Sequence, residues 1–158
     1  MNMETVLRDI DQPVAYDTLT IMKMIPHRYP FLMIDRVTDI RENHQAVGIK
    51  SVTIGDYFFQ GHFPSRPVMP GVLIIEAMAQ TAAVLVVHTL GSASEGKLVY
   101  FMSVEEAKFR KPVFPGCELH LQVTKLQNRR NVWKFRGDAY VDGQLMAEAT
   151  FAAMIMDD

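Results

Sequence analysis

The stretch Gly71–Leu90 is apolar over almost its whole length, reading GVLIIEAMAQTAAVLVVHTL. As an α-helix it would extend about 30 Å, which is also the length of a membrane span. Glu76, Gln80, Thr81 and His88 interrupt it, however, and a carboxylate near the middle of a membrane-spanning helix is costly. A helix buried on most sides inside a soluble domain accounts for both features. We therefore expect a central core helix and no membrane span.

Strand-like segments lie on both sides of this helix. Two precede it and four follow, rich in Val, Ile and Thr and separated by turn signals such as Asp142-Gly143. A short helix capped by Asp17 comes before them. The simplest way to bury the long helix is an α+β fold in which a curved, mostly antiparallel sheet of six strands wraps around it. The expected strands cover residues 31–40, 45–54, 98–108, 118–127, 132–141 and 144–156.

Composition indicates the class of protein and its compartment. A chain of 158 residues with 49% hydrophobic and 22% charged residues is typical of one globular domain, and we expect residues 1–16 to be loosely ordered. The single cysteine, Cys117, allows no intrachain disulfide. Glu4, Arg8 and Asp9 are unlike the start of a secretory signal. These features predict a cytoplasmic protein.

The charges are unevenly distributed along the chain. The net charge of −2 gives no reason to expect a nucleic-acid partner. Residues 97–136 nevertheless contain nine Lys or Arg and three Glu, whereas the rest of the chain has seven basic and fifteen acidic residues. A basic face on an acidic protein suggests an acidic partner. The alternative is that these are solvated strand faces whose charges mix in three dimensions, and the sequence leaves both readings open.

His62 lies in a loop that leads into the long helix. Residues 61–71 read GHFPSRPVMPG, and the prolines and glycines favour a rigid, irregular loop of the kind that often carries function. The loop ends at Pro70-Gly71, where the helix begins. Free N–H groups and the positive end of the helix dipole at Gly71 can hold a developing negative charge. This is an oxyanion site in outline.

Glu76 lies near the start of the helix between apolar neighbours, so it is poorly explained as part of a solvated face. Desolvation raises the pKa of a carboxyl group, which would keep Glu76 protonated and able to donate. Gln80, one turn later, could orient it through a hydrogen bond. The alternative is a buried ion pair with an arginine such as Arg66. A histidine base, a neutral acid and an oxyanion site suit proton abstraction next to a carbonyl and loss of a hydroxyl group, which is a dehydration.

Four segments of the chain carry a resemblance to a known family. They are IPHRYPFLMIDRV (25–37), GHFPSRPVMPGVLIIEAMAQ (61–80), AKFRKPVFPGCEL (107–119) and DGQLMAEATFAAMI (142–155). The second resembles the active-site segment of the hot-dog-fold β-hydroxyacyl-acyl carrier protein dehydratases of bacterial fatty acid synthesis, the FabZ type. The others also resemble that family, in family order, from about Thr20 to the C-terminus. Several motifs in order are more specific than one short pattern.

The resemblance implies conversion of (3R)-hydroxyacyl-acyl carrier protein to trans-2-enoyl-acyl carrier protein, with His62 as base and Glu76 as acid. No metal or cofactor is expected. Related dehydratase-isomerases carry aspartate at position 76, so the glutamate argues against isomerase activity. The family forms homodimers, often assembled in threes as hexamers, with His62 and Glu76 facing each other across the dimer interface. Two departures from the family pattern, Ser65-Arg66 and Cys117, leave the catalytic pair intact.

Further residues receive roles through the same resemblance. Gly71 is expected to bind the thioester oxygen, with Gln80 and Val68 as supporting residues. Candidates to line an acyl-chain tunnel, with Tyr100 as its gate, are Phe63, Val68, Met69, Leu73, Tyr100 and Phe101; the alternative for them is plain core. The basic residues expected to contact an acidic carrier protein are Lys108, Arg110, Lys111, Arg129, Arg130, Lys134 and Arg136.

The remaining histidines and two other functions complete the expectations. His27, His44, His88 and His120 are interpreted as structural or surface residues, because none has a carboxylate in a comparable setting. A hot-dog thioesterase would use the carboxylate to activate water and would release a free thiol. A non-catalytic acyl-chain or carrier-protein binding module would keep the fold without the reaction. Formation of an enoyl thioester without thiol release separates the dehydratase from both.

Overall fold

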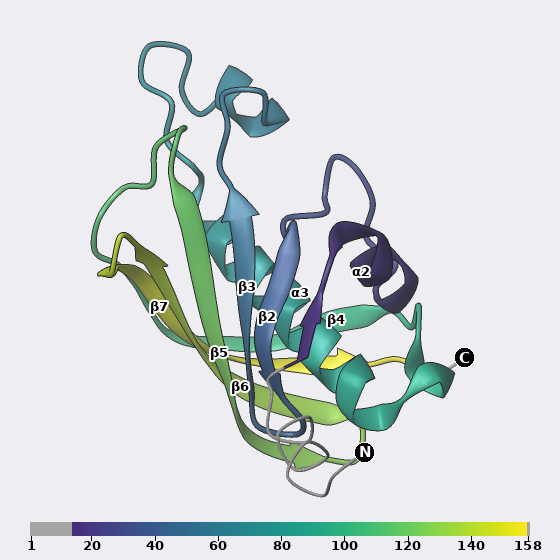
Figure 1. Cartoon of the computed structure of the whole chain (residues 1–158). Helices are drawn as coiled ribbons and strands as arrows, with labels where there is room; N and C mark the ends of the chain where they lie inside the picture. Colours follow the sequence, from purple (N-terminus) through teal and green to yellow (C-terminus); the bar gives the residue numbers. More distant parts are fainter. Residues whose placement is uncertain (1–13, 158) are drawn as a thin grey trace, which may run out of the picture.

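A computed structural model of the protein describes residues 14–157, which form a seven-stranded antiparallel sheet in the order β1-β2-β3-β5-β6-β7-β4. Figure 1 shows the sheet curving around the long helix α3 (Gly71–Leu90). A short helix, α2 (Thr18–Met24), and two 3-10 turns, η1 (Tyr57–Gln60) and η2 (Ser92–Ser94), complete the fold. The strands are β1 (Val14–Tyr16), β2 (Arg36–Arg41), β3 (Gln45–Ser51), β4 (Val99–Phe109), β5 (Glu118–Arg129), β6 (Val132–Val141) and β7 (Gln144–Ile155).

Helix α3 is the core of the protein, and it has the bounds that the sequence predicts. Every residue from Ala77 to Val87 is buried. By length and composition α3 is long and apolar enough to cross a membrane, with a mean hydropathy of 1.7 over its most apolar 18 residues. Of that stretch, however, 72% is buried inside the fold. Its apolar character is therefore explained by the sheet that surrounds it.

Two glycines of the sheet let α3 pack closely against it. A Cβ added at Gly48 on β3 would lie 2.0 Å from Oγ1 of Thr81, and one added at Gly137 on β6 would lie 2.5 Å from Sδ of Met78. Both distances are far below van der Waals contact, so a larger residue at either position would push the helix away from the sheet. These contacts set the position of α3 and of the polar side chains that it carries.

The expected architecture is confirmed, with one strand more than predicted. The additional strand, β1, pairs with β2 through Val14 opposite Ile40 and Tyr16 opposite Val37. It falls at the end of segment 1–16, which the sequence suggested is loosely ordered; the rest of that segment, residues 1–13, lies outside the described residues. The short helix is also confirmed, because Asp17 caps α2 by accepting a hydrogen bond from the Thr20 N–H at 2.9 Å.

Candidate active site

His62 is fixed through both its backbone and its ring. Its N–H donates to the carbonyl of Phe58 in η1 at 3.1 Å, and its carbonyl accepts from the N–H of Val68 at 3.0 Å. The ring Nδ1 lies 2.7 Å from the carbonyl oxygen of Val68. A carbonyl oxygen can only accept, so Nδ1 carries the proton and the neutral ring keeps a free lone pair on Nε2. His62 thus has the tautomer that a general base requires.

His62 opens on a cavity of about 440 Å³ at the N-terminal end of α3. Gly71 lines the same cavity, and the ring of Phe109 approaches it so closely that an added Cβ would lie 2.6 Å from two ring carbons. The first N–H groups of a helix, here those of Gly71 and Val72, have no acceptor within the helix. The cavity therefore places a histidine lone pair and helix N–H donors around one space.

Gln80 connects Glu76 to the loop between α2 and β2 through hydrogen bonds to both. Its side chain is completely enclosed, at 1% exposure. The Met33 N–H donates to Oε1 of Gln80 at 2.7 Å, which identifies the oxygen of the amide. The amide nitrogen then donates to the carbonyl of Phe31 at 2.7 Å and to Oε1 of Glu76 at 2.9 Å. Gln80 orients Glu76, as its spacing on the helix predicted.

Glu76 lies in an environment that favours its neutral form. Burial raises the pKa of this carboxyl, and the hydrogen bond from Gln80 offsets only part of that effect. The alternative of a buried ion pair with Arg66 is wrong, because the Arg66 guanidinium lies over the Phe114 ring, 5.9 Å from its centroid, and pairs with no carboxylate among the described residues. Its surroundings thus favour the protonated form of Glu76, the form that can donate a proton.

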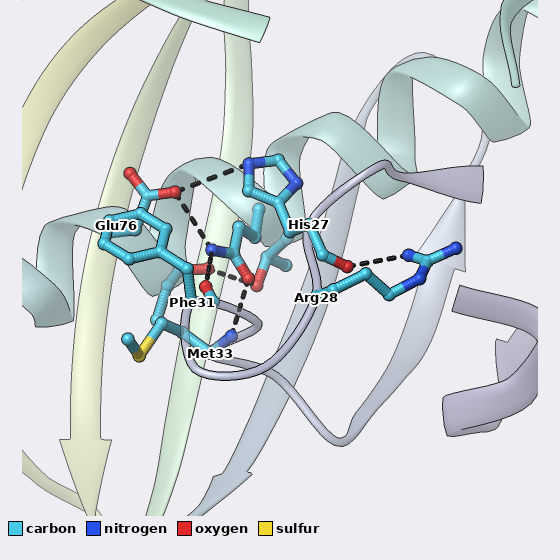
Figure 2. Close-up of polar contacts among 8 residues, drawn as sticks. His27, Arg28, Phe31, Met33 and Glu76 are labelled. Carbon is cyan, nitrogen blue, oxygen red and sulfur yellow. Dashed lines mark hydrogen bonds and ion pairs between the residues drawn. The ribbon is translucent and has the colours of Figure 1, made fainter. Parts of the chain in front are cut away.

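His27 is the residue of this region that sequence reasoning missed. Its Nε2 lies 3.5 Å from Oε1 of Glu76 (Figure 2), so the interpretation of His27 as a histidine without a carboxylate partner is wrong. Burial, followed by the neighbouring Arg28 charge, lowers the pKa of His27. The available signal was its place in the motif IPHRYPF, a proline-flanked segment comparable with the His62 loop.

A single chain does not bring His62 and Glu76 together. His62 faces the cavity of about 440 Å³, whereas Glu76 lines a separate cavity of about 20 Å³ with His27 and Gln80. Within residues 14–157, the polar contacts of Glu76 are to His27 and Gln80, and none is to His62. One chain therefore holds His62 and Glu76 at two separate places.

The apolar residues expected to line a tunnel near His62 have different surroundings. Met69 is buried and lines the cavity beside His62. Leu73 is partly buried and packs against the core. Phe63 is half-exposed and stacks on the His62 ring, with 4.2 Å between the ring centroids. Only Met69 and Val68 among the candidates share the cavity of His62.

Tyr100 and Phe101 lie on β4, the edge strand that pairs with β7 alone. Both side chains are exposed, at 54% and 40%. Phe101 also borders the small cavity of Glu76, whereas Phe109 at the other end of β4 lines the cavity of His62, so β4 runs past both cavities. The tunnel candidates are therefore divided between the two cavities of one chain.

The basic residues also fall into separate groups. Arg110 and Lys111 line the cavity of His62, and Lys108 precedes them at the end of β4. Nε of Arg110 lies 2.9 Å from a carboxylate oxygen of Glu148, which neutralises part of its charge. Lys108, Arg110 and Lys111 thus form a basic group at the end of β4, of which Arg110 and Lys111 border the cavity of His62.

The other four basic residues lie on β5 and β6. Arg129 and Arg130 are at the turn between these strands, and Arg130 borders a different cavity together with Thr89 near the C-terminal end of α3. Lys134 and Arg136 form ion pairs with acidic side chains of the same sheet. Arg136 shares Glu148 with Arg110, so it lies beside the group at the end of β4, whereas Arg129 and Arg130 lie at the turn between β5 and β6.

A long helix wrapped by a curved antiparallel sheet is the hot-dog fold, and solved structures resemble this chain over most of its length. A chain of the dehydratase heterocomplex ApeI:P from Xenorhabdus doucetiae matches with a TM-score of 0.74 at 16% identity, covering 87% of this chain and 91% of that one. The TT0310 protein from Thermus thermophilus matches with a TM-score of 0.59 at 16% identity, covering 82% and 100%. These matches show the fold alone.

Sequence similarity defines the family. The model of the FabA-like domain matches residues 25–150. The 3-hydroxyacyl-[acyl-carrier-protein] dehydratase FabZ of Paramagnetospirillum magneticum is 64% identical over 160 residues, covering 100% of this chain and 99% of the relative. The protein of the same name from Rhodospirillum rubrum is 67% identical over 142 residues, covering 90% and 89%. This chain belongs to the FabA-like family, among the dehydratases of the FabZ type.

The buried state of Glu76 predicts that Glu76→Gln stabilises the fold at neutral pH. The folded-state pKa lies above the ordinary value of 4.5, so the destabilisation is absent below pH 4.5, grows as pH rises from there to the folded-state pKa, and is constant above it. Glutamine keeps the shape and can still accept from Gln80. We expect the variant to unfold a few degrees above wild type at about pH 7–8 and level with it near pH 4, in thermal scans. A melting temperature of Glu76→Gln below that of wild type at neutral pH would contradict a raised pKa of Glu76.

Proposed function

We propose that this protein removes water from (3R)-3-hydroxyacyl-[acyl-carrier-protein] to give the trans-2-enoyl thioester in type II fatty acid biosynthesis. The observation that carries the proposal is a pair of complementary groups: His62 presents a free Nε2 lone pair, and burial raises the pKa of Glu76 and so favours its protonated form. The FabZ-type relatives are named for this reaction. Dehydration requires one group of each kind.

The steps follow from the positions of these groups. The thioester carbonyl binds at the N–H groups of Gly71 and Val72, and Nε2 of His62 removes the α-proton. The enolate charge on the thioester oxygen is stabilised by those N–H groups. Glu76 then donates its proton to the β-hydroxyl, the C–O bond breaks, and water leaves as the double bond forms. His62 ends with one proton more and Glu76 with one fewer, so the protons and electrons of the reaction balance within this pair.

The proposal includes a site shared between two chains. His62 and Glu76 face different cavities in one chain, and the β4 edge next to Glu76 exposes Tyr100, Met102 and Val104 at 54%, 53% and 45%. An exposed edge strand with apolar side chains is a surface that proteins normally cover. A second copy of this chain is the proposed cover, which gives a homodimer and, by resemblance, a hexamer of three dimers. We infer a cytoplasmic location for this assembly.

The proposal excludes double-bond isomerisation. A second proton transfer at the γ-carbon would require the acid to reach further along the acyl chain after the first step. Gln80 holds Glu76 through Oε1 at 2.9 Å, and Gln80 itself is fixed by Phe31 and Met33. A carboxyl group held in this way donates its proton at the β-hydroxyl and does not reach the γ-carbon.

His62→Ala and Glu76→Gln should each lower kcat by about a hundredfold to ten-thousandfold, because each removes one partner of the acid–base pair. The assay follows enoyl thioester absorbance from a 3-hydroxyacyl thioester and free thiol in parallel. His120→Ala is the matched control, since His120 is half-exposed and pairs only with Glu118 at 2.8 Å among the described residues. Wild-type turnover in either folded variant would refute the assignment, and thiol release without enoyl product would indicate a thioesterase.

Lys108 and Lys111 are the proposed contacts for an acidic carrier, because Lys111 lines the cavity of His62 with Arg110 and Lys108 lies close before them at the end of β4. The double variant Lys108→Glu/Lys111→Glu should raise KM for carrier-bound substrate about tenfold and leave KM for a small thioester unchanged, an effect that weakens at high salt. Arg129→Glu/Arg130→Glu is the matched control at the other end of β5. An equal rise in both double variants, or a rise with the small thioester, would contradict this placement.

A further inference from the structure

His27 faces Glu76 from the loop between α2 and β2 (Figure 2). Its Nε2 lies 3.5 Å from Oε1 of Glu76, and its side chain is 17% exposed. This distance is slightly beyond a good hydrogen bond, and such contacts often tighten when a substrate closes a site. The geometry pairs His27 with the same carboxylate oxygen that Gln80 contacts.

The loop that carries His27 is held rigidly by Arg28. The guanidinium donates to the carbonyls of Met22 at 2.6 Å, Ile25 at 3.0 Å and His27 at 2.7 Å. These carbonyls belong to the end of α2 and the residues after it, so Arg28 ties the loop to that helix. The His27 backbone is therefore fixed, and the loop holds its ring at the Glu76 carboxyl.

The hydrogen bonds around Glu76 determine the tautomer of His27. Oε1 of Glu76 already accepts the amide N–H of Gln80, whose orientation is set by the Met33 N–H. A ring nitrogen that faces this acceptor must bring an N–H, because two lone pairs would repel. The proton of neutral His27 then lies on Nε2. Nδ1, which is buried without a partner among the described residues, is left as an acceptor.

We propose that His27 is a positioning residue for Glu76: together with Gln80 it donates to Oε1, so that the acid proton lies on Oε2 and the carboxylate left after donation is stabilised. This inference rests on the proposed function. Two N–H groups on one oxygen make it the carbonyl-type oxygen of the acid and leave the other to carry the transferable proton. The same donors stabilise the negative charge that develops as the proton leaves.

His27 is the titratable group that faces Glu76 from the α2–β2 loop, and the Arg28 charge follows it in the chain. The remaining described side chains around the small cavity come from α3, β4 and β7 and carry no titratable group: Ala79, Gln80, Val99, Phe101 and Ala153. Burial and the Arg28 charge both lower the pKa of His27, which favours the neutral ring. A donor to the carboxylate lowers the pKa of Glu76, and loss of that donor raises it.

Two variants of the full-length protein test the role. His27→Phe keeps the ring and removes the N–H, whereas His27→Gln places an amide N–H close to the position of Nε2. We expect His27→Phe to lower kcat about tenfold with KM unchanged, and to move the alkaline limb of the kcat profile to higher pH. His27→Gln should restore kcat to within about threefold of wild type, because it restores the donor. It should also return the alkaline limb of the kcat profile to the pH seen in wild type.

Carboxyl NMR of protein labelled with ¹³C-glutamate reads the Glu76 titration without substrate, with Glu76→Gln assigning the signal. The proposal requires a higher Glu76 pKa in His27→Phe and a value near wild type in His27→Gln. An unmoved Glu76 titration in His27→Phe would overturn it, and so would equal kcat losses in both variants with no change in the pH limb. If Glu76→Gln kept full activity while the NMR shift was present, the pairing would stand and the proposed function would fail.

Discussion

The buried amide of Gln80 is the interaction on which the acid side of the site depends. It is bonded to the backbone of Met33 and Phe31 and to the carboxyl of Glu76, at 2.7, 2.7 and 2.9 Å. Because these groups are enclosed, losing the amide would leave buried donors and acceptors unpaired, at about 1–3 kcal/mol each. Gln80 therefore joins α3 to the loop that carries His27 and fixes the acid by the same bonds.

Helix α3 fills the core and also carries Glu76 and the free N–H groups at its N-terminus. Its close approach to the sheet at Gly48 and Gly137 sets where its side chains lie, and its N-terminus supplies free N–H groups at Gly71. Burial of Glu76 inside this packing destabilises the charged carboxylate and raises the pKa of this group, which favours its protonated form. Burying this carboxyl lowers the stability of the fold. The same burial favours the protonated form that we propose as the proton donor.

Local patterns predicted most of the fold, and tertiary contacts account for what was missed. The apolar run of α3 and the turn at Asp142-Gly143 were readable because composition and turn chemistry are local. β1 was missed because three residues at a sheet edge carry no periodic signal. The contact between His27 and Glu76 could not be read either, because it joins residues far apart in sequence. The surroundings of Glu76 and the rigid His62 loop were predictable from their immediate neighbours.

The central claim is that two chains complete each site, and co-expression of His62→Ala chains with Glu76→Gln chains tests it most directly. A mixed dimer would hold one site with both wild-type groups and one with neither. Random pairing should therefore restore about a quarter of wild-type activity per chain, far above the sum of the two single variants. Activity no higher than that sum, in an oligomer shown by two tags to contain both chains, would contradict the shared site.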